Sequence, residues 1–167
     1  LHDALPIYKL GEGVKAIALP DERWDKVDIK TTNLIPNILA QTKAEKKFAY
    51  TAMLFRDGIC TEGATSNVFA VKDGILYTHP ADNHILKGIT RQMIVTRVAP
   101  SLGITLIEKE FDRAFVDDAD ELFFTDTIGG VIPIIKLDKN PVSGGKPGHV
   151  TLRLREALEK LMEEGLP

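Results

Sequence analysis

The spacing of hydrophobic and polar residues changes along the chain and predicts a mixed α/β protein. Three segments have apolar residues at helical spacing, and seven short runs have the composition of strands. Because proline lacks the N–H that continues a helix, Pro100 is expected to end the middle helix, and Asp73-Gly74 predicts a hairpin turn. The predicted helices are 33–47, 90–99 and 149–164, and the predicted strands are 14–19, 50–55, 67–72, 75–78, 104–108, 121–125 and 131–137.

Composition limits the classes of protein that the chain can represent. With 167 residues, 44% hydrophobic and 27% charged, it is long enough for one domain with its own core. A net charge of −3 without a basic patch argues against nucleic-acid binding, and no apolar run approaches the ~18 residues of a membrane span. The single Cys60 excludes an internal disulfide and fits a reducing cytoplasm. The histidines lack the spacing of a metal site, so no metal is expected.

Two segments contain residue types that suit a charged, phosphorylated ligand. Residues 61–69 place Glu62 before an asparagine and an aromatic residue, and residues 86–91 read Leu-Lys-Gly-Ile-Thr-Arg. A Gly-x-Thr step at the start of a helix offers free backbone N–H groups, a hydroxyl and the positive end of the dipole to a phosphate. Taken alone, Glu62 could equally be an exposed turn residue, and Thr90 could be an ordinary helix cap.

Lys30 is the third candidate. It follows apolar Val27 and Ile29 in a strand-like segment that runs directly into the first predicted helix. An amine held in an apolar environment is more readily deprotonated and is therefore a better nucleophile. A lysine chosen at random is more often a solvated surface charge; the residues downstream favour Lys30.

In this order and spacing, the segments resemble the signature of class IV (fold-type IV) pyridoxal-phosphate aminotransferases. The resemblance covers 21–167, for which it implies a pyridoxal 5′-phosphate (PLP)-binding domain. It implies a pseudobarrel of mainly antiparallel strands with outer helices, within the α/β (α+β) class. It also implies that Lys30 is the Schiff-base lysine and general acid–base, and that Glu62 is the partner of the pyridine nitrogen.

The same resemblance assigns the phosphate side of the site. Ile89 and Thr90 match residues that bind the cofactor phosphate, and Leu86 matches the leucine packed behind the ring. Residues 124–130 resemble the second phosphate loop, with Thr127 as hydroxyl donor. Asp126 departs from the family pattern; because a carboxylate repels a phosphate, its side chain is expected to point away.

The implied reaction is transamination between an amino acid and a 2-oxo acid by a cytoplasmic homodimer. Asn33-Leu34 after the lysine is closest to D-amino-acid aminotransferases, so D-alanine and 2-oxoglutarate are the expected substrates. Branched-chain aminotransferases and aminodeoxychorismate lyases usually have Asn-Tyr there, whereas Thr127-Ile128-Gly129-Gly130 resembles (R)-selective amine transaminases. These alternatives stay open, as does an inactive fragment that only binds PLP.

The beginning of the chain is unusual. Residue 1 is not methionine, and 1–7 resemble a translated sequencing adapter, so this segment is expected to be an artefact. Family members carry a further small α/β domain before the matching region. We therefore expect 8–20 to be the end of a truncated N-terminal region or linker, and the chain as written to be a poor catalyst.

Overall fold

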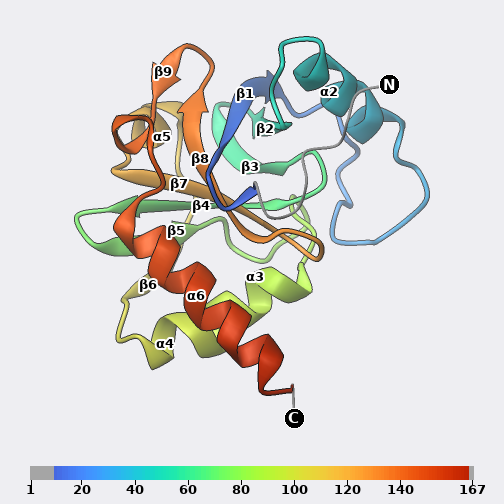
Figure 1. Cartoon of the computed structure of the whole chain (residues 1–167). Helices are drawn as coiled ribbons and strands as arrows, with labels where there is room; N and C mark the ends of the chain where they lie inside the picture. The colour runs from blue at the N-terminus through green and yellow to red at the C-terminus, as the bar shows by residue number, and fades with distance from the viewer. Residues whose placement is uncertain (1–9, 166–167) are drawn as a thin grey trace.

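The computed structural model describes residues 10–165, so the expectation for 1–7 lies outside the described residues (Figure 1). Within this range, nine strands form one curled sheet in the order β3-β2-β1-β8-β7-β4-β5-β6, with β9 paired to β8. The strands are β1 (Val14–Pro20), β2 (Thr51–Arg56), β3 (Ile59–Gly63), β4 (Asn67–Lys72), β5 (Ile75–Thr78), β6 (Leu106–Glu108), β7 (Glu121–Asp126), β8 (Gly130–Leu137) and β9 (Asn140–Pro141).

The sheet is mixed but mainly antiparallel, as the sequence predicted. Three pairings are parallel, β1 with β2, β1 with β8, and β5 with β6. The other five pairings are antiparallel. Strand β1 lies within the sheet between β2 and β8, although the sequence analysis placed 8–20 in a preceding region. The division into domains stays a prediction.

The helical segments match the predicted helices closely at the end of the chain and less closely before it. They are α2 (Ile35–Glu45), α3 (Ile89–Met93), a π-helical turn (Ile94–Val98), α4 (Ala99–Ser101), α5 (Arg113–Asp117), a 3-10 turn (Ser143–Gly145) and α6 (His149–Glu163). The helical segments follow one another without a break from 89 to 101, so the middle helix passes through Pro100 and ends one residue after it. No helix among residues 10–165 is both long and apolar enough to cross a membrane.

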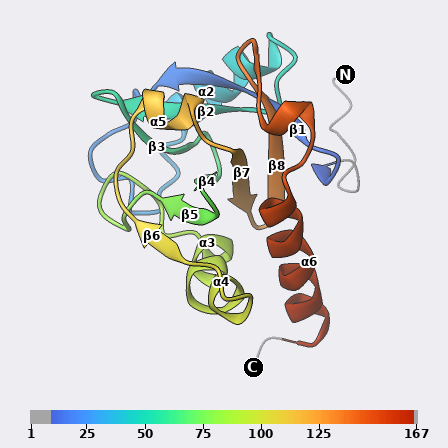
Figure 2. The same cartoon turned by 90° about the vertical axis from the view of Figure 1, so that its left-hand side faces the viewer.

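Helices pack against the sheet in two separate places. Figure 2 shows α6 beside the α3–α4 segment, and both pack on the apolar face that contains Phe69 and Phe123. These two rings are paired across β4 and β7 and stack with centroids 4.9 Å apart. Helix α2 lies at the other end of the molecule, where Ala40 and Ala44 pack near β1 and β2 (Figure 1).

Candidate active site

A cavity of about 290 Å³ opens between the loop before α2, the β3–β4 turn, the start of α3 and the end of β7. A pocket of this size suits a small organic ligand. The cavity is lined by all six residues singled out in the sequence, although they come from segments far apart in the chain. These residues are Lys30, Glu62, Leu86, Ile89, Thr90 and Thr127.

Lys30 lies in the irregular segment before α2, which differs from the expected strand. Val27 is buried and its N–H donates to the carbonyl of Asn83 over 2.9 Å, so this segment is held by a loop and by no sheet neighbour. Ile29 is 52% exposed, and Lys30 is exposed as well. The apolar environment expected around Lys30 is therefore absent in this structure. Its position on the cavity, by contrast, agrees with the spacing argument.

Glu62 lies on β3 and is buried, which excludes the exposed-turn alternative. Its carboxylate accepts hydrogen bonds from the guanidinium of Arg23, from Asn67 Nδ2 over 2.8 Å and from the Leu86 N–H over 3.0 Å. Burial raises the pKa of Glu62 to about 7, although the positive charge and hydrogen bond of Arg23 act in the opposite direction. A buried carboxyl with such a pKa can share a proton with a basic ring nitrogen near neutral pH.

Arg23 is a site residue that sequence reasoning missed. It is 7% exposed, and besides Glu62 it contacts Asp21 through two of its nitrogens, over 2.7 and 2.8 Å. Burial opposes the ionisation of Asp21, but the hydrogen bonds and charge of Arg23 outweigh it and hold the pKa of Asp21 below its usual value. Arg23 therefore connects two carboxyl groups and fixes the position of Glu62. In the sequence, nothing around Arg23 distinguishes it from an arginine exposed on the surface.

Thr90 and the 126–129 loop form the opposite end of the cavity. The Thr90 hydroxyl donates to the carbonyl of Asp126 over 2.9 Å and joins the start of α3 to the end of β7. The Asp126 carboxylate accepts from the N–H groups of Ile128 and Gly129, over 2.9 and 2.6 Å, and from the Tyr50 hydroxyl over 3.3 Å. Asp126 therefore turns toward its own loop. Burial, together with the Asp126 carboxylate, raises the pKa of Tyr50.

Several features of the cavity are typical of a surface that receives a polar ligand. Among the described residues, Ser66 Oγ and Thr125 Oγ1 are buried without a hydrogen-bond partner, and both residues line the cavity. Buried polar atoms are rarely left unpaired, so these hydroxyls are candidates for ligand contact. Gly88 borders the same space, and a Cβ at this position would collide with Asn67 Oδ1. A glycine is therefore required where the backbone passes Asn67.

Comparison with known proteins agrees with this geometry. Residues 5–137 match the family described as Amino-transferase class IV. The chain is 42% identical over 158 residues to D-alanine aminotransferase of Staphylococcus aureus (strain COL), an alignment that covers 95% of this chain and 56% of that enzyme. The chain thus spans about half the length of the curated relatives it matches.

Solved structures share the fold. A branched-chain aminotransferase from Thermoproteus uzoniensis with norvaline superposes with a TM-score of 0.84 and 31% identity, over 90% of this chain and 52% of that one. An aminotransferase from Brucella abortus bound to the co-factor PLP gives a TM-score of 0.80 and 26% identity, over 90% and 55%. The family and fold expected from the sequence are confirmed: the chain belongs to the class IV aminotransferases.

Proposed function

We propose that this protein carries out PLP-dependent transamination of a D-amino acid such as D-alanine, with 2-oxoglutarate as acceptor. The observation that carries the proposal is that Lys30, Glu62, Thr90 and Thr127 all line the same cavity. An amine, a buried carboxyl and a hydroxyl-rich end are the groups that a phosphorylated pyridine aldehyde requires. The substrate class is supported by the name of the Staphylococcus aureus relative.

The cavity residues fit this cofactor in charge and in hydrogen-bonding capacity. Lys30 would hold it covalently, Glu62 would face its ring nitrogen, and Leu86 would pack against its ring. Ile89, Thr90 and Thr127 would bind its phosphate, to which the unpaired Thr125 hydroxyl can add a donor. When bound, PLP withdraws electrons from the substrate carbon that loses its proton.

The remaining chemistry belongs to the side chains of the chain. Once released, the amine of Lys30 would take the proton from the substrate Cα as general base. It would then deliver the proton to the C4′ carbon of the cofactor as general acid. Glu62 would hold a proton at the ring nitrogen, and its hydrogen bonds from Asn67 and Leu86 keep it in place. Arg23 maintains a positive charge beside this carboxyl, so the protonation state of Glu62 depends on a neighbour that belongs to the same chain.

The role of Lys30 is tested by chemical trapping. The chain is incubated with PLP, reduced with borohydride and mapped by peptide mass spectrometry. We expect the pyridoxyl group on Lys30 and none in a Lys30→Ala variant. Lys87 is also exposed and belongs to the 86–91 segment, so Lys87→Ala is the matched control and should label normally. Label on Lys87 in place of Lys30 would refute the assignment.

The substrate class is tested by a panel of amino donors. D-alanine, L-leucine and an (R)-amine are mixed in turn with the PLP-loaded protein, and conversion of the cofactor is followed by its absorbance. Faster conversion by D-alanine supports the proposal. Faster conversion by L-leucine would favour branched-chain transamination, an alternative supported by the name of the Thermoproteus uzoniensis structure.

We also propose that the protein acts as a homodimer in the cytoplasm. Apolar side chains on α2 support self-association, since Ile35 and Ile38 are 66% and 59% exposed. A buried free thiol at Cys60 suits a reducing compartment. Light scattering coupled to size-exclusion chromatography should give twice the mass of the chain, and Ile38→Lys should shift the mass to that of one chain. A single-chain mass for the unaltered protein would contradict the dimer.

A further inference from the structure

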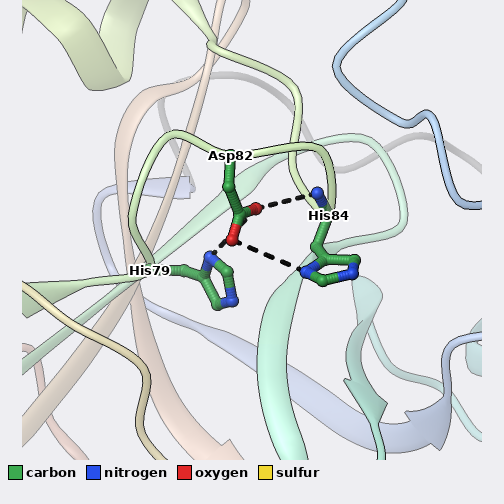
Figure 3. Close-up of side chains that lie close together, drawn as sticks. All are labelled: His79, Asp82 and His84. Carbon is green, nitrogen blue, oxygen red and sulfur yellow. Dashed lines mark hydrogen bonds and ion pairs between the residues drawn. The ribbon is translucent and has the colours of Figure 1, made fainter.

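Two histidines and an aspartate meet in the loop between β5 and α3, outside the residues assigned to the cavity (Figure 3). One ring nitrogen each of His79 and His84 and one carboxylate oxygen of Asp82 lie within 4.8 Å of one another. His79 Nδ1 is 3.8 Å from Asp82 Oδ1, and His84 Nδ1 is 3.5 Å from Asp82 Oδ2. No metal site was expected from the sequence, because the spacing of the histidines along the chain does not reveal that the loop brings two of them to one carboxylate.

Backbone contacts hold this loop in shape. The His84 N–H donates to Asp82 Oδ1 over 2.8 Å, and the Asp82 N–H donates to the Pro80 carbonyl over 2.8 Å. Arg91 donates to the carbonyl of His79 over 2.8 Å. His79 Nδ1 lies 2.9 Å from the Pro80 carbonyl, and a proton on Nδ1 that donates to it leaves Nε2 free in the neutral ring. Metal-binding histidines are commonly oriented by such a bond from the second nitrogen.

We propose that His79, Asp82 and His84 form a binding site for a divalent transition metal ion, with Zn²⁺ as the best match. Two imidazoles and one carboxylate are a donor set typical of zinc and neighbouring first-row metals. Mg²⁺ and Ca²⁺ prefer oxygen ligands and suit the site poorly. The proposal does not depend on the transaminase function.

The burial of the three side chains suits an ion that enters from solvent. His79 is 2% exposed at its side chain, whereas Asp82 and His84 are 34% and 35% exposed. One ligand is thus fixed in the protein, and the other two can move to close on the ion. The three ligand atoms lie within 4.8 Å of one another, whereas tetrahedral zinc needs ligand atoms about 3.4 Å apart. Side-chain movements of roughly 1–1.5 Å would therefore complete the site, with water as the fourth ligand.

The position of the site suggests what the ion would do. The carbonyl of His84 accepts from Arg23 over 3.3 Å, and the carbonyl of Asn83 accepts from the N–H of Val27 over 2.9 Å. The same loop therefore supports both the Glu62 network and the segment that carries Lys30. An ion that binds only the folded loop stabilises it by mass action and raises the unfolding temperature of the protein.

The test uses untagged protein that has been stripped of metal and kept at neutral pH. Zn²⁺ binding is measured by calorimetry, and the ligand set is examined through the visible absorption of bound Co²⁺. We expect one ion per chain, a rise in unfolding temperature with Zn²⁺, and no comparable heat from Mg²⁺. His84→Ala and Asp82→Asn should weaken binding at least about tenfold. Asparagine retains the oxygen that accepts from the His84 N–H, so the loop keeps its turn.

His149→Ala is the matched control, because it removes an exposed histidine at the start of α6. This variant should bind Zn²⁺ like the unaltered protein. Two outcomes would overturn the proposal: no Zn²⁺ binding by the unaltered protein, or equal affinity in the His84→Ala and His149→Ala variants. Either would mean that Asp82 only pairs with the two imidazoles and organises the loop.

Discussion

Glu62→Gln should change the way in which the stability of the protein depends on pH. The pKa of Glu62 is raised from 4.5 to about 7, mainly by burial and against the attraction of Arg23. The folded state therefore binds the Glu62 proton more tightly than the unfolded state does. The resulting stabilisation is fully present below pH 4.5 and is lost as pH rises through about 7. Glutamine has a similar size and does not titrate.

The size of the effect follows from the two pKa values. At about 1.4 kcal/mol per pH unit between 4.5 and 7, the unaltered protein should lose ~3 kcal/mol relative to the variant. At this chain length, 1 kcal/mol corresponds to roughly 2–4 °C in unfolding temperature, so the relative shift is about 6–12 °C. The attraction of Arg23 for the ionised carboxylate is already contained in the pKa of Glu62. Any difference in contacts between glutamine and the protonated carboxyl is the same at every pH, so it cancels when the two pH values are compared.

The assay is urea unfolding of the cofactor-free protein, followed by circular dichroism at about pH 5 and about pH 8. The free-energy difference between the unaltered protein and Glu62→Gln should move by ~3 kcal/mol in favour of the variant at the higher pH. Glu22→Gln makes the same chemical change at an exposed position and should shift stability by less than about 0.5 kcal/mol. If the difference is the same at both pH values, the attraction of Arg23 governs and Glu62 is ionised throughout.

Three further predictions concern the structure around the site. Gly88→Ala should destabilise the protein by about 1–3 kcal/mol in urea unfolding, because the new Cβ displaces Asn67 from its hydrogen bonds. Asp126→Ala should cost about 1–3 kcal/mol and speed amide exchange at Gly129, since two backbone N–H groups of its loop lose their acceptor. Cys60 is buried and its pKa is raised by that burial, so a thiol reagent should not react before unfolding; prompt labelling in native buffer would contradict this.

The parts of the fold that the sequence predicted well are those where packing follows a simple period. The last helix was expected at 149–164 and is observed at His149–Glu163, because its apolar residues keep one helical face against the sheet. The strand Ile59–Gly63 was missed. This strand is buried on both faces, and two of its buried residues, Thr61 and Glu62, are polar. Their polar atoms are paired with Asp21, Arg23 and Asn67, so the strand shows no alternation of hydrophobic and polar residues.

The residues of the candidate site also fall into those that the sequence predicted and those that it did not. Motif spacing placed six residues, and all six line one cavity. Arg23 could not be found, because its partner Glu62 is 39 residues away and no local pattern separates it from solvated charges. Asp126 was recognised as a departure, but its role in folding the 126–129 loop depends on two N–H groups of that loop.

Lys30 shows which kind of sequence argument is reliable here. Its apolar neighbours predicted a buried amine, yet Lys30 and Ile29 are both exposed, since this segment has no sheet partner to bury alternate residues. Its distance along the chain from Glu62 predicted a shared site, and both residues line the same cavity. An amine that bonds to an incoming carbonyl must be reachable as well as deprotonated. The case for Lys30 therefore depends on access from the cavity that also contains Glu62, and trapping by borohydride measures that access directly.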